Sequence, residues 1–184
     1  MLGDELKRMQ KHLDTNAKRR CLYFAYGSNM SLRRLQQRVP SATKYCRARL
    51  NGYQLRFHKH SKTDGSAKCD AYMTGDTGDW VEGVVYEFDL SDKAKLDRVE
   101  GKGMGYGTKQ IKVSNLHGQT FEAYTYIATD INVSLKPFDW YQQHVLTGAR
   151  ENHLPEAYIS RIAAIETITD DDKQRCVREL AIYS

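Results

Sequence analysis

The sequence predicts an α+β fold in which a mixed, barrel-like β-sheet is surrounded by peripheral helices. The middle of the chain consists of short apolar runs rich in β-branched and aromatic residues, separated by turns at glycine or aspartate. Such runs are typical of strands. Apolar residues at helical spacing precede this strand-rich middle and return after it, so strands and helices are segregated along the chain.

Residues 1–20 differ from the rest of the chain and predict a charged N-terminal helical extension. Leu2, Leu6, Met9 and Leu13 are spaced as a narrow apolar stripe on a strongly charged helix. Such a segment could pack on the domain, mediate self-association or fray. Because the remaining length suits one compact core, we expect residues 21–184 to form a single domain.

A strand, a glycine turn and a helix start follow this extension. Residues 23–26 form an apolar run that predicts a short buried strand, and Gly27 is expected to adopt a backbone conformation that a side chain would forbid. Ser28 or Asn29 is expected to cap the next helix. Because helix starts present unpaired N–H groups, the sequence predicts a cradle here for a carboxylate or a phosphate.

The remaining elements follow from periodicity and turn residues. Strands are expected at residues 48–58, 71–73, 81–88, 108–113 and 121–127. Helices are expected around Leu32 and Leu35 and at residues 91–99, 138–146, 155–165 and 172–181. Residues 59–68 are polar and contain Gly65, so we expect a mobile loop there, at the mouth of a site.

Composition argues against several classes of protein. No apolar run approaches the length of a membrane span, and the first residues lack the apolar core of a signal peptide, so we expect a cytoplasmic protein without a membrane partner. The four cysteines are widely spaced and are expected to stay reduced. His58 and His60 alternate along a strand without a third ligand, so no metal site is expected.

The net charge of +5 raises the alternative of nucleic-acid binding. Basic residues are concentrated in the first third of the chain and include Arg33, Arg34, Arg38, Arg47, Arg49, Arg56, Lys59 and Lys62. They are interleaved with acidic and apolar residues, whereas binding to a phosphate backbone needs a contiguous basic face. We therefore expect a solvated surface and no nucleic-acid partner, although the charge could help to draw in anionic substrates.

Several motifs in a fixed order connect the chain to a known family. They are Tyr-Phe-Ala-Tyr-Gly-Ser-Asn-Met at residues 23–30, the strand-like run at 81–88, Leu-Asp-Arg-Val-Glu-Gly at 96–101, the run at 124–127 and the segment 140–155. Together they resemble the γ-glutamylcyclotransferase family over about residues 22–166. Members of that family carry an F-A-Y-G-S-N strand and turn, a G-V-V-Y/W strand and an E-G pair that holds the catalytic glutamate.

The resemblance implies the family's barrel and an enzyme that needs no cofactor and no metal. In the family's reaction, the α-amine of a γ-glutamyl group attacks its own γ-carbonyl, which forms 5-oxoproline and expels the amine or amino acid joined there. Glu100 occupies the position of the catalytic glutamate, and we expect a partly buried site to raise its proton affinity. The resemblance is also compatible with a homodimer.

The substrate-binding positions that we predict lie at the turn and on tyrosines: Tyr23, Tyr26, Gly27, Ser28, Asn29, Tyr106, Tyr126 and Tyr141. Backbone N–H groups of the turn could bind the α-carboxylate of the substrate or polarise the carbonyl under attack, and both roles stay open. Tyr106, Tyr126 and Tyr141 match tyrosines of the family's pocket. For Tyr126 and Tyr141, a purely structural place in the core is an equal alternative.

Three functions therefore stay open. The favoured one is a γ-glutamylcyclotransferase, an acyltransferase or lyase type of activity that takes small γ-glutamyl amino acids or peptides and takes part in glutathione turnover. A second keeps the chemistry but releases a different leaving group, as in γ-glutamylamine cyclotransferases. A third is a non-catalytic binding or interaction protein on the same fold.

Overall fold

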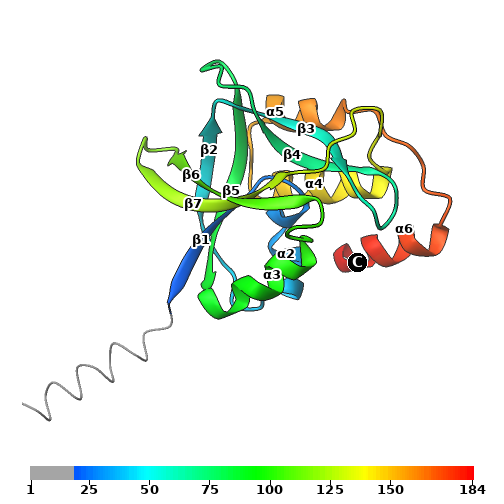
Figure 1. Cartoon of the computed structure of the whole chain (residues 1–184), viewed down its shortest axis with the longest axis horizontal. Coiled ribbons are helices and arrows are strands. Elements are labelled where there is room, and N and C mark those ends of the chain that lie inside the picture. The colour runs from blue at the N-terminus through cyan, green and yellow to red at the C-terminus, as the bar shows by residue number, and fades with distance from the viewer. Residues whose placement is uncertain (1–18) are drawn as a thin grey trace, which may run out of the picture.

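A five-stranded closed barrel forms the centre of the structure, a computed structural model that describes residues 19–184 (Figure 1). Its strands are β1 (Arg20–Ala25), β5 (Trp80–Asp89), β2 (Thr43–Asn51), β6 (Tyr106–Asn115) and β7 (Thr120–Ala128), in this spatial order. β1 runs antiparallel to β5 and parallel to β7, where Tyr23 pairs with Tyr124. The barrel is therefore mixed, which confirms the predicted fold class.

The two remaining strands, β3 (Tyr53–His60) and β4 (Ala67–Met73), form a separate two-stranded sheet. The predicted single strand at residues 48–58 is wrong, because the chain reverses at Gly52, whose φ of 79° belongs to the left-handed region. The loop predicted at residues 59–68 is also shorter than expected. Lys59 pairs with Lys68 in the β3–β4 ladder, so only residues 61–66 connect the two strands.

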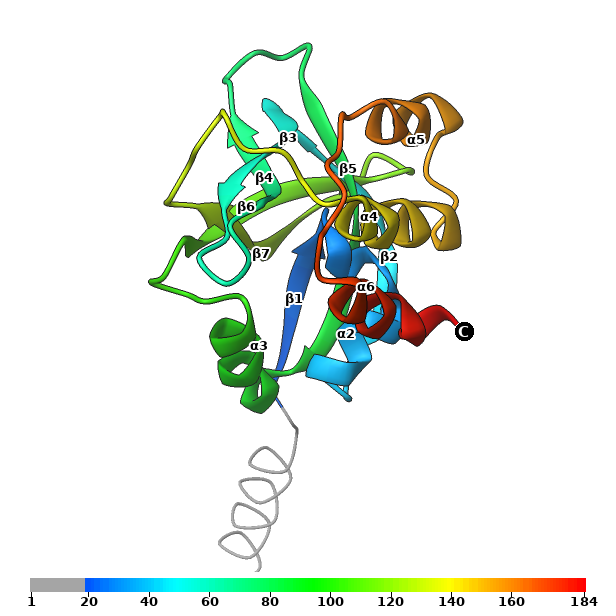
Figure 2. The same cartoon turned by 90° about the vertical axis from the view of Figure 1, so that its right-hand side faces the viewer.

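The helices pack around this framework at the predicted places. They are α2 (Leu32–Arg38), α3 (Lys93–Val99), α4 (Asp139–Glu151), α5 (Glu156–Ala163) and α6 (Lys173–Leu180), with short 3₁₀ helices η1 (Ser28–Met30), η2 (Leu90–Asp92) and η3 (Ala181–Tyr183). Figure 2 shows α4 and α5 side by side on one flank, α3 at one end of the barrel, and α6 in front of α2. Among the described residues, no helix combines the length and the apolarity that crossing a membrane requires.

The turn after β1 is held in place by α4 and the barrel core. A Cβ added to Gly148 of α4 would lie only 2.6 Å from Met30 Cβ, so the helix packs directly on η1. The Met30 carbonyl accepts hydrogen bonds from the Tyr86 hydroxyl at 2.6 Å and from Asn152 Nδ2 at 2.8 Å. The backbone at the end of β1 is therefore fixed by buried contacts from elements far away in sequence.

The predicted N-terminal extension falls almost entirely outside the described residues. The structure begins to describe the chain at residue 19, and β1 begins at Arg20. The helical stripe of residues 2–13 and the division of the chain at residue 20 accordingly stay predictions.

Candidate active site

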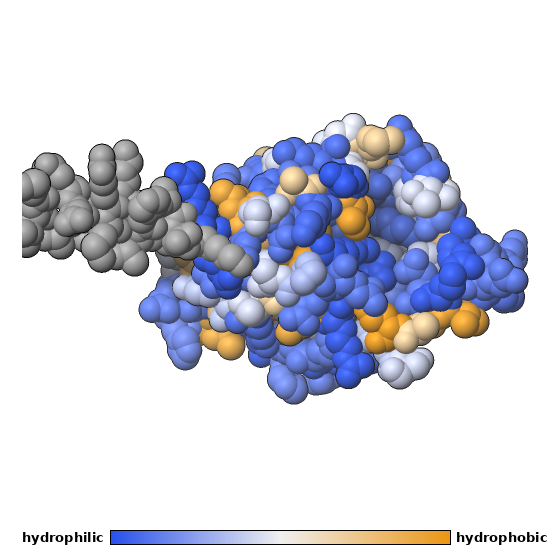
Figure 3. Space-filling view, turned by 90° about the horizontal axis from the view of Figure 1, so that it is seen from below, coloured by the Kyte–Doolittle hydropathy of each residue, from blue (hydrophilic) through white to orange (hydrophobic). Residues whose placement is uncertain are grey.

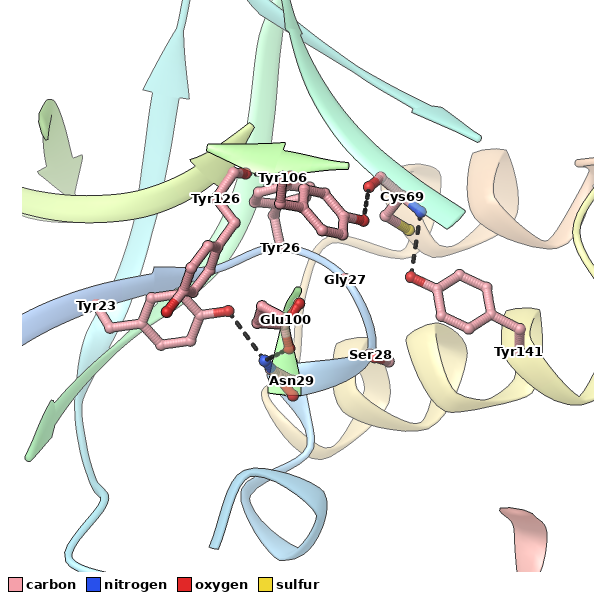
Figure 4. A pocket seen from close by; sticks show the side chains of 10 residues that line it. All are labelled: Tyr23, Tyr26, Gly27, Ser28, Asn29, Cys69, Glu100, Tyr106, Tyr126 and Tyr141. Atoms are coloured by element: carbon pink, nitrogen blue, oxygen red, sulfur yellow. Dashed lines mark hydrogen bonds between the residues drawn. The ribbon is translucent and has the colours of Figure 1, made fainter. Parts of the chain in front are cut away.

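The nine predicted site residues line one pocket, although they come from five separate parts of the fold, and β4 adds a tenth residue (Figure 4). The pocket is formed by the turn after β1, by the residues after α3 and by β4, β6, β7 and α4. Its lining residues are Tyr23, Tyr26, Gly27, Ser28, Asn29, Cys69, Glu100, Tyr106, Tyr126 and Tyr141. Cys69 was missed because no neighbouring residue marks it as functional in the sequence, and only the β3–β4 pairing brings it here.

Close neighbours, and not a left-handed backbone conformation, favour glycine at position 27, which corrects the prediction. Its φ is −116°, outside the left-handed region that favours glycine. A Cβ at this position would instead lie 3.1 Å from Cys69 Cβ and 3.5 Å from the Tyr141 hydroxyl. A side chain on Gly27 would therefore press on Cys69 and the opposite wall of the pocket.

The turn presents free backbone donors. The Gly27 carbonyl accepts the N–H of Met30 at 3.0 Å, whereas the N–H groups of Gly27, Ser28 and Asn29 find no backbone carbonyl in the described part of the chain. Unpaired N–H groups at the start of a helical turn favour anions or a polarised carbonyl oxygen. The geometry thus matches the cradle that the sequence predicts, and its ligand stays a prediction.

Asn29 does not cap a helix as predicted, and its side chain holds Glu100 instead. Ser31 is the N-cap residue of α2, and no side chain there makes a capping hydrogen bond. The buried Asn29 amide donates from Nδ2 to Glu100 Oε1 at 2.8 Å and to the Tyr23 hydroxyl oxygen at 3.1 Å. Its buried side chain in η1 thus bonds a carboxylate that is distant in sequence and not the end of a helix.

Glu100 follows α3 directly and turns back toward the barrel. Its Oε1 also accepts a hydrogen bond from Arg38 Nη1 at 2.7 Å, and the side chain is only 15% exposed. Arg38 donates from the same nitrogen to Asn29 Oδ1 at 2.7 Å, so the three side chains form a closed group. Oε2 makes no hydrogen bond within residues 19–184, which leaves one carboxylate oxygen for a ligand.

The five tyrosines of the pocket are structural walls with neutral hydroxyl groups. Burial raises the pKa of Tyr26, Tyr106 and Tyr141 well above the ordinary value, and it raises the pKa of Tyr23 and Tyr126 as well. Tyr26 and Tyr106 donate to the carbonyls of Tyr126 and Cys69, each at 2.5 Å. Tyr126 and Tyr141 are each buried and also line the pocket, so a place in the core and a place in the pocket do not exclude each other for these two residues.

A wider basin of about 420 Å³ lies outside this pocket and shares Ser28, Glu100, Tyr106 and Tyr141 with it. Its charged lining consists of six cations and three anions: Arg34, Arg38, Lys59, Lys62, Lys68 and Arg98 with Asp64, Glu100 and Glu179. The face drawn in Figure 3 contains a hollow, and hydrophilic side chains dominate its surroundings. The inner pocket holds only about 30 Å³, so a ligand larger than a few atoms has to extend into the basin.

The basin corrects the interpretation of the basic first third as a solvated surface. Four of those residues, Arg34, Arg38, Lys59 and Lys62, line the basin. The Arg34 and Arg38 side chains are 13% and 20% exposed and form ion pairs with Glu179 and Glu100. The sequence does not indicate these ion pairs, because Glu179 and Glu100 lie far from the two arginines along the chain.

Known proteins of one family are similar to this chain in sequence and in fold. The AIG2-like family model matches residues 80–162. The gamma-glutamylcyclotransferases of Homo sapiens and Bos taurus are 36% and 35% identical to the chain, and each alignment spans 79% of this chain and 78% of the relative. A solved gamma-glutamyl cyclotransferase structure superposes with a TM-score of 0.76 at 29% identity, covering 88% of this chain and 99% of that one. The chain belongs to the γ-glutamylcyclotransferase family.

Proposed function

We propose that the protein is a γ-glutamylcyclotransferase that releases 5-oxoproline from small γ-glutamyl substrates, with Glu100 as its catalytic acid and base. The observation that supports this most strongly is the placement of one held carboxylate opposite a turn with three free N–H groups, at the bottom of a tyrosine-walled pocket. An intramolecular cyclisation needs these parts: a group that moves protons, donors for a developing charge, and walls that fold the substrate on itself.

The reaction can be written with the residues that the pocket contains. The α-amine nitrogen of the γ-glutamyl group forms a bond to the γ-carbonyl carbon, and the bond from that carbon to the leaving nitrogen breaks. Glu100 accepts the proton that the amine must lose and returns a proton to the leaving nitrogen. Because the substrate supplies its own nucleophile, the protein contributes proton transfer, orientation and electrostatic stabilisation.

The free Oε2 of Glu100 is the atom that we assign to this proton transfer. Oε1 is occupied by Asn29 and Arg38, and these two donors fix the plane of the carboxylate. A base held by two hydrogen bonds keeps its orientation while its other oxygen exchanges a proton. The turn N–H groups of Gly27, Ser28 and Asn29 then serve either the substrate's α-carboxylate or the oxygen of the reacting carbonyl.

The finer parts of the proposal concern substrate and setting. Small γ-glutamyl amino acids or peptides, including glutathione, fit a pocket that opens into a cation-rich basin. We place this activity in the turnover of γ-glutamyl compounds in the cytoplasm. The tyrosine walls supply apolar contact for the methylene groups of the glutamyl chain.

Turnover by purified protein tests this proposal. Wild type, Glu100→Gln and the control Glu122→Gln, which changes an exposed glutamate on β7, are incubated with γ-glutamyl amino acids, glutathione and γ-glutamylamines. We expect 5-oxoproline release, measured by mass spectrometry, from wild type and the control. Glu100→Gln should lose about 10²- to 10⁴-fold in rate with an unchanged melting temperature. Full activity in Glu100→Gln, or no release by wild type from any substrate, would contradict the proposal.

A further inference from the structure

Lys59 is a buried lysine at the mouth of the candidate site. It lies near the end of β3, its exposure is only 8%, and it lines the basin together with Glu100 and Tyr106. Its Nζ lies 4.7 Å from the centroid of the Tyr106 ring. A Cβ on Gly105 would lie 2.9 Å from Lys59 Cε, so the end of the side chain is packed closely against backbone. The ammonium group therefore has a defined position.

Among the described residues, the ammonium group of Lys59 has no hydrogen-bonded anionic partner, unlike the other half-buried or buried cations of the basin. Arg34 pairs with Glu179 at 3.0 Å, Arg38 with Glu100 at 2.7 Å and Lys68 with Asp64 at 2.7 Å. Within residues 19–184, Lys59 Nζ makes no hydrogen bond and no ion pair.

A charge held in this way is costly unless an anion completes the site. Burial lowers the pKa of Lys59, while the nearby carboxylate of Glu100 acts in the opposite direction and favours the charged form. The ring face of Tyr106 compensates part of the lost hydration but offers no oxygen acceptor. Since Lys59 lines the open basin, an incoming carboxylate can reach it.

We propose that Lys59 binds the carboxylate of the leaving amino acid and thereby selects γ-glutamyl amino acids and peptides over γ-glutamylamines. The inference rests on the proposed function. Tyr106 and Glu100 line both the inner pocket and the basin, so the leaving nitrogen departs past them and toward Lys59. An α-amino acid carries its carboxylate on the carbon next to that nitrogen, which keeps the anion close to the bond that breaks.

The rest of the basin agrees with a leaving group of this chemistry. Val99 and Met104 expose 52% and 70% of their surface and line the basin beside the cations, so an apolar side chain of the departing amino acid has a surface to contact. A simple amine would leave the ammonium group of Lys59 without an anion within hydrogen-bond distance. The geometry thus favours γ-glutamyl substrates whose leaving group carries a carboxylate over γ-glutamylamines.

A matched pair of substrates isolates the interaction. γ-Glutamyl-L-alanine and γ-glutamyl-L-alaninamide differ only in whether the leaving group carries a carboxylate or a neutral amide. We expect wild type to prefer the carboxylate in kcat/KM by about 10- to 100-fold, the range for a hydrogen bond to a charged group. Lys59→Met should remove most of this preference by slowing the carboxylate substrate, while kcat/KM for the amide changes little.

Two controls separate Lys59 from the general positive field. Lys62→Met removes a cation from the same hairpin, but its side chain is 64% exposed and its Nζ lies 4.0 Å from Asp130. We expect this variant to keep most of the preference. Lys59→Gln, which keeps a polar but uncharged and shorter side chain, should lose the preference as Lys59→Met does, and melting temperatures of all variants confirm that they are folded.

The outcomes distinguish this inference from the proposed function. Absence of 5-oxoproline from these two substrates and from the whole panel of γ-glutamyl compounds with wild type would overturn both. Turnover of both substrates with a preference that survives in Lys59→Met and Lys59→Gln would overturn only the assignment of Lys59. Equal losses for the carboxylate and the amide would also overturn it, because they would mean that Lys59 supports the site without contacting the leaving group.

Discussion

At the scale of single residues, Glu100 gains its position from side chains that are distant in sequence. Asn29 and Arg38 precede it by 71 and 62 positions, yet both donate to the same carboxylate oxygen. The motif around residues 96–101 points to Glu100, and the turn motif points to Asn29. Arg38 lies in neither motif, so the sequence gives no reason to select it from the other arginines of the first third.

Cys69 allows a prediction at the same scale. Burial raises the pKa of its thiol to about 12, so the thiolate is nearly absent at neutral pH. We expect native protein treated with iodoacetamide at pH 8 to remain unmodified at Cys69 and to keep its turnover. Peptide mapping by mass spectrometry, with protein unfolded in guanidinium as the positive control, measures this. Rapid labelling of Cys69, with turnover lost in parallel, would contradict the account of an inert buried thiol.

At the scale of elements, α6 is attached to the molecule by polar contacts as well as by Cys176 and Leu180, which are half-buried against the core. Arg34 pairs with Glu179, and the buried His144 contacts Glu179 Oε2 at 3.2 Å and the Tyr183 hydroxyl at 2.9 Å. Burial lowers the pKa of His144, so the neutral imidazole donates from Nε2 to the carboxylate and accepts at Nδ1 from the tyrosine. No residue of α6 itself is buried.

This attachment predicts a pH-dependent stability. The hydrogen bond from His144, together with Arg34, lowers the pKa of Glu179 from 4.5 to about 2. A lowered carboxyl pKa contributes stability that is complete above the unfolded value and is lost as the pH falls through the folded value. We expect Glu179→Gln to have a lower melting temperature than wild type at pH 7. The difference should stay constant down to about pH 5 and shrink below pH 4.5, as measured by circular dichroism. A constant difference down to pH 3 would contradict this assignment.

Helices and strands can be predicted where a periodic pattern is long. The prediction is less accurate where a turn sets the end of an element. Helices α4, α5 and α6 lie at the predicted places, and β5 and β7 fall on predicted strands. The turn at Gly52 was missed because the apolar pattern continues across it from β2 into β3. The pairing of β3 with β4 extends into a polar stretch whose lysines place their ammonium groups over aromatic rings, and the polarity of the sequence does not indicate these tertiary contacts.

At the scale of the whole molecule, the sequence predicts the class of fold and nine of the ten described residues that line the inner pocket, but not Cys69 and not the basin. Matches to family motifs identify most residues of the inner pocket, because each motif can be recognised in the sequence without knowledge of the fold. The basin depends on how α2, α3, α6 and the β3–β4 hairpin approach one another, and no local pattern encodes that approach. Cations that form a solvated surface and cations that line a cavity are therefore indistinguishable in the sequence.

The division of the chain can be tested by truncation. The carboxylate of Glu100, its donors Asn29 and Arg38 and the N–H groups of the turn all belong to the described residues, so we expect a protein shortened to residues 19–184 to retain the kcat and KM of the full chain. Steady-state release of 5-oxoproline by both proteins measures this, and size-exclusion chromatography with light scattering shows whether self-association changes. A large loss of kcat in the shortened protein would show that residues 1–18 contribute to the site and would contradict the proposed division.

The hydrogen bonds from Asn29 and Arg38 to Glu100 also have a consequence for folding. Contacts between residues so far apart have high contact order, and they form only after the entropy of closing a long loop has been overcome. No short fragment of the chain contains both the carboxylate and its two donors. In the mechanism that we propose, catalytic competence thus requires the folded barrel that brings these three side chains together, and a partly synthesised chain that ends before Glu100 lacks it.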